Sequence, residues 1–349
     1  MRMILIHTPY IHMTRKIFLL SLVFLLTACQ QNTPEVNVYS ARQEALIKPL
    51  LDAFTAETGI KVNIISSKAD ALLQRIQSEG ANSPADVLLT TDAGRLYRAK
   101  SAGVFAPILS DTLNENIPEN YRDSENTWFG LSVRARPIMV TDKFSALELT
   151  DYEQLADSKL SGSVCIRSSG NIYNQSLVAS IIEQAGEPAA EEWARGLVSN
   201  LARKPQGGDR DQIRAAAAGQ CTVVVANTYY LANMLADADK PDDYNAASKM
   251  KIIWPNQDSR GVHVNVSGAG VLKTAPNKDN GVKFIEFLSS QQAQQIYADV
   301  NFEYPVKASV KVNAILSQWG DFKADALPLE KLGNRNSDAV KLMDRAGWK

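Results

Sequence analysis

The chain has 349 residues, and its 37 lysines and arginines nearly balance 38 aspartates and glutamates, giving a formal net charge of −1 at pH 7. No basic stripe or block interrupts this balance, which argues against nucleic acid as a partner. The length that remains after removal of an N-terminal leader is enough for two domains.

The N-terminal segment has the pattern of a secretion signal. A short positive region, Met13–Lys16, precedes an apolar run that is too short for a transmembrane helix. The run ends in Leu26-Thr-Ala-Cys29, which resembles a bacterial lipobox. Residues 1–28 are therefore predicted to be a lipoprotein signal peptide, with either Met1 or Met13 as the start. An ordinary cleaved signal followed by an incidental cysteine is the alternative.

Cys29 would then be the lipidated first residue of the mature protein, and residues 29–35 would form a tether. This places the protein in the periplasm, held at the membrane only through its lipid. After processing, Cys165 and Cys221 remain. An even cysteine count in an oxidising compartment favours one disulfide between them, with two buried free thiols as the alternative.

The first third of the chain alternates strands and helices. A helix is predicted over 44–58, because its apolar residues recur at spacings of three and four. Gly59 is expected to end it. The elements expected here are strands 36–40, 60–65 and 85–90 with helices 44–58 and 69–79. This β-α-β-α-β order predicts a parallel sheet wound by helices.

The rest of the chain predicts a second lobe and a return to the first. Strands 128–133 and 137–140 are expected to pair and to lead into the second lobe. Further strands are expected at 164–167, 223–226 and 262–272, with helices at 173–184, 190–200, 211–218, 280–289, 290–297 and 338–343. The predicted fold class is α/β, with two doubly wound lobes joined by a two-strand hinge. Lobe 1 comprises 36–133 and 262–312, lobe 2 comprises 134–261 and 313–349, and ligand would lie between them.

Two adjacent tyrosines are the most informative local feature. An apolar strand, Val223–Ala226, runs into a polar turn, and Tyr229 and Tyr230 then open a helix. The first turn of a helix after a strand is where α/β proteins place ligand groups. Two phenols there, in a chain with only three histidines, indicate a hard, oxygen-preferring cation, with ferric iron the leading candidate. Alternatively, one tyrosine packs in the core and the other lies on the surface.

Six motifs occur in an order that resembles a known family. They are Val36–Gln43, Ser83–Asp92, Trp128–Arg136, Ile166–Ser176, Ala226–Tyr230 and Phe302–Pro305. Together they resemble the periplasmic ferric-iron-binding proteins of ABC importers, over essentially the whole mature chain. The resemblance implies the class II periplasmic-binding-protein fold. It also implies delivery of Fe(III) to an ABC permease in the inner membrane, by a protein expected to act as a monomer.

The resemblance also implies a ligand set. Tyr173, Tyr229 and Tyr230 would be phenolate ligands. Many members of the family carry a histidine ligand where this chain has Gln43. That departure resembles the subgroup that uses three tyrosines and a bound carbonate. The anion would then lie near Arg42 and Gln43.

Arginines of the crossing strand complete the expected anion site, with Arg134 or Arg136 as the further partner. A free phenol has a pKa of about 10, and a trivalent cation lowers that pKa by direct electrostatic stabilisation. Three phenolates neutralise Fe³⁺, so a carbonate makes the complex negative and calls for nearby arginine charge. Arginine binds planar oxyanions through two parallel hydrogen bonds.

Several other residues have a structural interpretation beside a functional one. Tyr39 could support the ligands from behind but is expected to pack or to form a hydrogen bond. Glu44 could be a sixth ligand but is expected to be a solvated charge at a helix start. His263 is expected to be structural, and Gly207–Gln212 lacks the end of a phosphate-binding loop and is expected to cap a helix.

No catalytic set is visible. Asp86 and Asp92 are expected to be turn and hinge residues, and no base is paired with a nucleophile, so an enzyme is not predicted. The alternative function is the same fold binding another small solute, such as an organic anion, phosphate, thiamine or a polyamine.

Overall fold

The computed structural model describes residues 33–144 and 149–349, and Glu35–Lys349 form one compact unit. The predicted signal peptide and Cys29 lie outside the described residues. Within the described ranges, no helix has both the length and the apolar character needed to cross a membrane.

The first sheet has five strands in the order β2-β1-β3-β9-β4. Their bounds are β1 Glu35–Ser40, β2 Lys61–Ser66, β3 Val87–Thr91, β4 Phe129–Ala135 and β9 Val264–Val271. Strands β1, β2 and β3 are parallel, and β9 runs antiparallel between β3 and β4. The β-α-β-α-β order and the parallel pairing predicted for the first third of the chain are confirmed.

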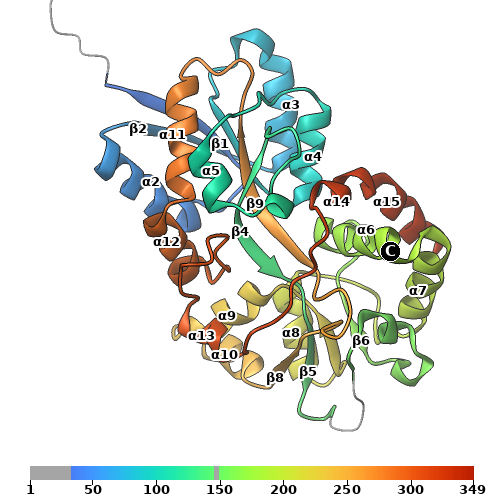
Figure 1. Ribbon diagram of the computed structural model, residues 1–349. Helices are drawn as coiled ribbons and strands as arrows, with labels where there is room; N and C mark the ends of the chain where they lie inside the picture. The colour runs from blue at the N-terminus through green and yellow to red at the C-terminus, as the bar shows by residue number, and fades with distance from the viewer. Residues whose placement is uncertain (1–32, 145–148) are drawn as a thin grey trace, which may run out of the picture. The chain divides into compact units, whose positions relative to one another are not determined.

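Helices cover both faces of this sheet (Figure 1). Helices α2 (Glu44–Thr58) and α11 (Lys278–Leu288) contact each other, as do α3 (Ala69–Glu79) and α4 (Ala93–Ser101). Helix α2 buries Ile47, Leu50 and Phe54, in agreement with its predicted apolar face. It ends at Gly59, whose φ of 70° lets its N–H return to the carbonyl of Thr55. Two further helices are α5 (Asp111–Asn116) and α12 (Gln291–Asn301).

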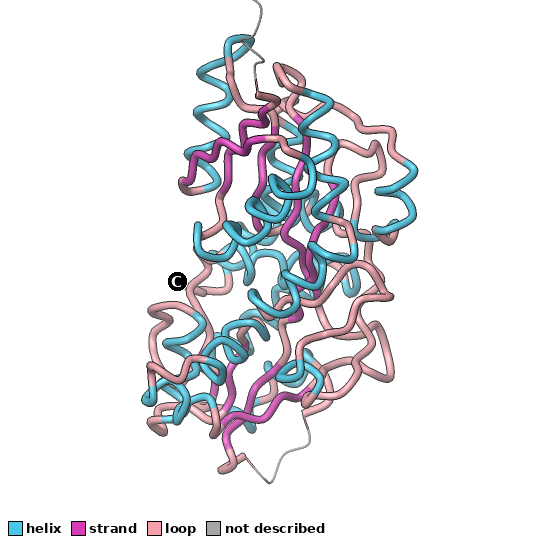
Figure 2. The backbone as a smooth tube through the Cα atoms, turned by 90° about the vertical axis from the view of Figure 1, so that its left-hand side faces the viewer, coloured by secondary structure: helices cyan, strands magenta, loops and turns pink. Residues whose placement is uncertain are grey.

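The second sheet has four strands in the order β6-β7-β5-β8, and Figure 2 shows the strands in two groups. Their bounds are β5 Ile138–Thr141, β6 Val164–Cys165, β7 Val223–Val225 and β8 Met250–Ile253. The surrounding helices are α6 (Ile172–Ala185), α7 (Glu187–Ser199), α8 (Asp209–Ala217), α9 (Thr228–Ala236) and α10 (Pro241–Ala247). Strands β6 and β7 are parallel.

A disulfide links β6 to the segment just before β7. Cys165 of β6 is bonded to Cys221, with 5.9 Å between their Cα atoms, so the predicted pairing is confirmed. Short 3-10 helices in the described residues are Gly80–Asn82, Glu119–Tyr121, Tyr152–Ala156 and Ser158–Leu160.

The pairing predicted between strands 128–133 and 137–140 is wrong. Strand β4 pairs with β9 in the first sheet, whereas β5 pairs with β7 and β8 in the second. Arg136 and Pro137 carry the chain from one sheet to the other. Proline has no N–H to donate to a ladder, so this dipeptide breaks the pairing rather than forming a hairpin. Strand β4 stays in the first sheet through Ala135, two residues past the predicted lobe boundary.

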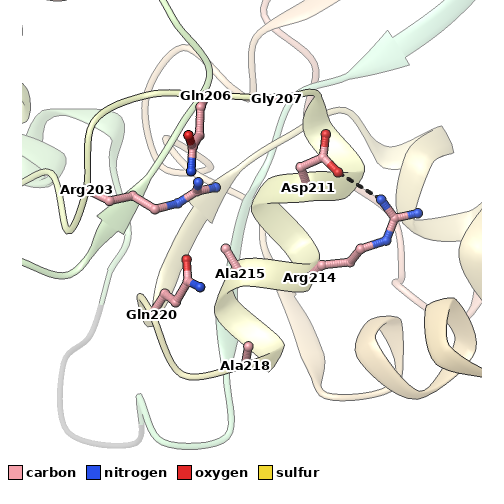
Figure 3. Close-up of a pocket in the computed structure, with 8 residues that line it drawn as sticks. All are labelled: Arg203, Gln206, Gly207, Asp211, Arg214, Ala215, Ala218 and Gln220. Carbon is pink, nitrogen blue, oxygen red and sulfur yellow. Dashed lines mark hydrogen bonds and ion pairs between the residues drawn. The ribbon is translucent and has the colours of Figure 1, made fainter.

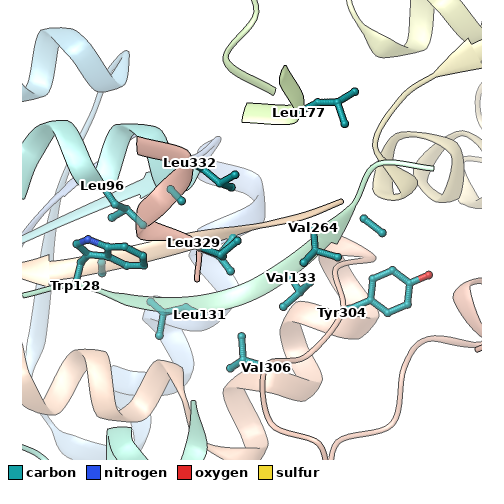
Figure 4. Close-up of a cluster of buried hydrophobic side chains, with 14 of the residues drawn as sticks. Leu96, Trp128, Leu131, Val133, Leu177, Val264, Tyr304, Val306, Leu329 and Leu332 are labelled. Atoms are coloured by element: carbon teal, nitrogen blue, oxygen red, sulfur yellow. The ribbon is translucent and has the colours of Figure 1, made fainter. Parts of the chain in front are cut away.

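The C-terminal segment contacts both halves of the unit. Its helices are α13 (Ala314–Ser317), α14 (Glu330–Asn334) and α15 (Asn336–Arg345). Helix α15 packs on α6 and α7, while α14 packs on α4 of the first half and on α6 of the second. Figure 4 shows the buried side chains at this meeting point, with Leu329 and Leu332 near Leu96. One cluster of buried apolar side chains includes residues of both sheets, and a smaller second cluster, with Met139, Ile213 and Val224 among its members, lies in the second half.

Candidate metal centre

The three tyrosines come together because two parallel strands end at the same edge. Tyr173 is in the first turn of α6, after β6, and Tyr229 and Tyr230 are in the first turn of α9, after β7. The Tyr229 hydroxyl donates a hydrogen bond to the Tyr173 hydroxyl at 3.3 Å. The rings of Tyr229 and Tyr230 have centroids 4.1 Å apart. Three phenol groups therefore meet within one small region.

All three phenols line a cavity of about 280 Å³ together with predicted anion-binding residues. The second half of the unit contributes Tyr173, Arg210, Tyr229, Tyr230 and Asn233. The first half contributes Ala41, Arg42, Gln43, Leu46, Thr91, Arg95, Arg134 and Glu303. The structure thus brings Arg42, Gln43 and Arg134 to the same cavity as the tyrosines.

Glu303 binds both of the arginines predicted for the anion. Arg42 donates to the two carboxylate oxygens of Glu303 from Nη1 and Nη2, each at 3.1 Å, and Arg134 Nε donates at 3.2 Å. These side chains are only 2–3% exposed. The Ser267 hydroxyl accepts from both arginines. Burial alone would raise the pKa of Glu303, but the two arginine charges outweigh it and hold that pKa below its ordinary value.

Two nitrogen donors of these arginines are left over by the contacts with Glu303 and Ser267. Nη1 of Arg134 is buried and has no hydrogen-bond partner among the described residues, and Nε of Arg42 is in the same condition. The guanidinium carbon of Arg134 lies 5.6 Å from the ring centroid of Tyr229. A buried donor without a partner is costly, so Arg134 is ready to bind an acceptor in the cavity.

Burial favours the protonated form of Tyr229 and of Tyr230. Burial, with the neighbouring tyrosines, raises the pKa of Tyr229 well above its ordinary value. Burial also raises the pKa of Tyr230, although the charge of Arg167 opposes the shift. A ligand that turns these phenols into phenolates must therefore supply strong positive charge at their oxygens, as a trivalent metal ion does.

Other donor sets for a metal are missing from the parts of the chain that the structure describes. No cluster of three or more histidine, cysteine, aspartate or glutamate side chains there could hold an ion. His263 is buried, and burial with the charges of Arg136 and Arg260 lowers its pKa to about 3, which agrees with a structural role.

Tyr39, considered as a support for the ligands, and Arg136, considered as an alternative anion partner, both lie outside the cavity lining. The Tyr39 hydroxyl donates to Glu79 at 2.8 Å. Arg136 donates to Asp209, Asn227 and Asn174.

Arg136 therefore ties together the starts of α8, α9 and α6, the last two of which carry the tyrosines. Glu44 is exposed at the start of α2, as its interpretation as a solvated charge predicted, and it does not line the cavity.

Sequence reasoning missed five polar residues of the cavity: Thr91, Arg95, Arg210, Asn233 and Glu303. Arg95 and Arg210 stand in the first turns of α4 and α8. Arg95, whose helix follows β3, could have been found from the rule that α/β proteins place ligand groups in the first turn of a helix after a strand, which also pointed to Tyr229. No carboxylate lies within ion-pair distance of either arginine in the described part of the chain. Glu303 belongs to the motif Phe302–Pro305. Its neighbours in the sequence give no sign that it pairs with Arg42, which lies 261 positions away.

The glycine-rich segment Gly207–Gln212 forms a helix start beside a separate pocket (Figure 3). The Asp211 carboxylate accepts the Gly208 N–H at 2.7 Å and pairs with Arg214 at 2.8 Å. The Asp211 carboxylate thus accepts a backbone N–H at the start of α8, and the predicted helix cap is confirmed.

Comparison with known proteins defines the class of this fold. The structure is similar to that of the Trichodesmium protein FutA (IdiA) in complex with iron and citrate ligands, at 51% identity and a TM-score of 0.87, covering 90% of this chain and 100% of the other. It is also similar to apo ferric ion-binding protein A of Pasteurella haemolytica, at 44% identity and a TM-score of 0.84, covering 90% and 98%. The fold is that of the class II periplasmic binding proteins, as expected.

The sequence places the chain in a family. Residues 82–323 match the bacterial extracellular solute-binding protein family, and the chain belongs to it. A Synechocystis relative, "Iron uptake protein A1", is 50% identical over 93% of each chain. The "Major ferric iron-binding protein" of Neisseria meningitidis serogroup B is 28% identical over 93% of this chain and 96% of its own. The family consists of solute-binding proteins and not enzymes.

Proposed function

We propose that this protein captures ferric iron in the tyrosine-lined cavity and delivers it to an ABC permease of the inner membrane. Tyr173, Tyr229 and Tyr230 are the phenolate ligands, and a small oxyanion, carbonate in the simplest case, completes the coordination. The observation that carries the proposal is the meeting of three phenols in one cavity beside Arg134, whose Nη1 has no partner. The relatives named for iron uptake or ferric iron binding support the same metal.

The charges of the cavity favour an anion beside the metal. Three phenolates neutralise Fe³⁺, so any added carbonate makes the complex negative. The cavity is lined by Arg42, Arg95, Arg134 and Arg210, and Glu303 is the carboxylate in its lining. The remaining positive charge stabilises an anionic complex, most strongly where water is excluded.

The two predicted anion-binding arginines take different roles in this proposal. Both Nη atoms of Arg42 bind Glu303 or Ser267, which leaves only Nε of Arg42 without a partner. Arg134 shares Glu303 through Nε and keeps Nη1 for the anion. Gln43 is exposed at the rim of the cavity and offers a side-chain amide to the same anion.

We further propose that the protein acts as a monomer in the periplasm, anchored through a lipid on Cys29. The family supports an extracytoplasmic location, and the lipobox-like sequence before Cys29 supports the anchor. Metabolic labelling with a palmitate analogue tests the anchor, since Cys29→Ser should abolish the label and release the protein from membranes.

A spectral titration tests the metal and its ligands. Ferric nitrilotriacetate added to the apo protein in bicarbonate buffer should produce a visible tyrosinate-to-iron band that saturates at one iron per chain. Each phenol that binds the metal must lose its proton, so about three protons should be released by the ligands per iron. If no band forms, while phosphate or an organic anion raises the melting temperature, the cavity binds another solute and the proposal is wrong.

A further inference from the structure

Asp92 is a buried carboxylate that the proposed metal site does not use. It lies between β3 and α4 with a backbone φ of 82°, a conformation that L-residues other than glycine rarely adopt. Its side chain is fully buried and accepts the N–H of Gly94 at 2.8 Å, which caps α4. Capping alone does not require burial or positive φ, so the other contacts of this carboxylate need an explanation.

Two further donors reach Asp92 from distant parts of the chain. The Ser176 hydroxyl of α6 donates at 2.7 Å, and Asn265 Nδ2 of β9 donates at 2.9 Å. Asn265 is the partner of Arg134 in the pairing of β4 with β9. Ser176 follows Tyr173 by three residues on the same helix. The carboxylate therefore lies between the strand pair that carries Arg134 and the helix that carries Tyr173.

The surrounding contacts bring α4 and α6 close together. A Cβ on Gly94 would lie 3.5 Å from the Ile172 side chain, which is an ordinary contact distance, so the start of α4 lies against the start of α6. Asn336 Nδ2 donates to Gln175 Oε1 at 3.0 Å, which adds the start of α15 to the junction. Figure 1 shows α6 below α14 and α15, in agreement with their contacts.

We infer that Asp92 is a positioning residue: through Ser176 it holds the start of α6, and so sets the place of the Tyr173 phenol relative to Arg134. The inference rests on the proposed function, because it treats Tyr173 as a metal ligand. Its physical basis is that a hydrogen bond to a buried carboxylate is stronger than one between neutral groups. Ser176 and Asp92 form such a bond between an element of the first sheet and an element of the second.

The first test compares two serines of α6. Ser176→Ala removes the bond to Asp92. Ser180→Ala is the matched control, because Ser180 is equally buried one turn later but donates within its own helix, to the Leu177 carbonyl. Ser176→Ala should weaken ferric iron binding about ten-fold or more, the loss expected for a hydrogen bond to a charged group. Ser180→Ala should bind iron as the wild type does. Equal affinity in both variants would overturn the inference.

The second test asks whether Ser176 acts through Tyr173, using a double-mutant cycle. Tyr173→Phe removes the phenolate and leaves two others, so binding should remain measurable. If Ser176 acts only by placing the Tyr173 oxygen, adding Ser176→Ala to Tyr173→Phe should cause no further loss. The wavelength of the visible band should shift in Ser176→Ala and stay unchanged in Ser180→Ala.

The outcomes separate the two proposals. Additive losses in the cycle would show that Ser176 stabilises the protein generally, and would overturn the positioning role while the metal site stands. A wild-type protein that gives no tyrosinate band would instead overturn the proposed function. Melting temperatures of both serine variants, measured without iron, control for stability, because the inference requires the iron-affinity loss to be specific to Ser176.

Discussion

The two sides of the cavity are prepared in opposite ways. On the arginine side, Glu303 binds both Arg42 and Arg134 through buried hydrogen bonds. On the tyrosine side, Tyr173 and Tyr229 share one long hydrogen bond, and burial keeps Tyr229 and Tyr230 protonated. The comparison indicates a division of work, in which one side supplies a preorganised positive environment and the other supplies ligands that change only when the metal binds.

The largest expected effect is on the tyrosine side. Tyr229→Phe and Tyr230→Phe should each weaken ferric iron binding by more than the roughly 10–100-fold that is typical for loss of a residue behind the ligands. Phenylalanine keeps most of the packing, so the circular dichroism spectrum should be unchanged. Competition against nitrilotriacetate measures the affinity, and Tyr244→Phe, a change at an exposed tyrosine outside the cavity, is the control. If both variants keep wild-type affinity and colour, the iron site lies elsewhere.

On the arginine side, removal of the Glu303 carboxylate should lower the stability of the folded protein. Glu303→Ala leaves two buried arginines without their carboxylate and should lower the free energy of unfolding by about 3–5 kcal/mol. Urea unfolding of the apo protein measures this loss. Tyr230→Phe should lower the free energy of unfolding far less. A Glu303→Ala variant as stable as the wild type would show that the arginine side is not preorganised by this ion pair.

The same ion pair predicts a pH dependence. The pKa of Glu303 is depressed in the folded protein, so its stabilising contribution is present above the unfolded pKa of about 4.3 and is lost as pH falls through the folded value. The stability difference between wild type and Glu303→Gln should therefore shrink below about pH 4. A difference that stays constant from pH 7 to pH 3 would contradict an ionised Glu303.

The disulfide stabilises the half that carries the tyrosines. Breaking the bond between Cys165 and Cys221 with Cys165→Ser/Cys221→Ser should cost about 2–4 kcal/mol of stability, although the balance of entropy and enthalpy behind that value is disputed. A thiol assay on denatured, unreduced protein that begins after Cys29 should find no free thiol. Two reactive thiols would contradict the bond.

The smallest expected effect distinguishes the two arginines. Arg134→Lys keeps the charge but removes the paired N–H donors of the guanidinium, so it should weaken iron binding about ten-fold in bicarbonate. The affinities of mutant and wild type should converge when bicarbonate is excluded. Arg42→Ala should lose affinity in both buffers, because it also frees Glu303. If Arg42→Ala alone depends on bicarbonate, Arg42 and not Arg134 holds the anion.

Local patterns predicted much of the fold and the ligands but not the contacts between distant segments. The helices at 44–58 and 69–79 have the predicted bounds, since their apolar spacing and terminal glycines are local signals. The placement of Tyr229 and Tyr230 after a strand was equally visible. The failed pairing of β4 with β5, and the roles of Glu303 and Asp92, depend on partners that lie far away in the sequence.

The central claim is that all three phenol oxygens bind one ferric ion, and an anomalous-difference map of iron-loaded crystals at the iron absorption edge tests it most directly. One strong peak should lie within bonding distance of the hydroxyl oxygens of Tyr173, Tyr229 and Tyr230, with density for an anion between the metal and Arg134. A peak that contacts none of these oxygens, or iron bound only at surface carboxylates, would contradict the account.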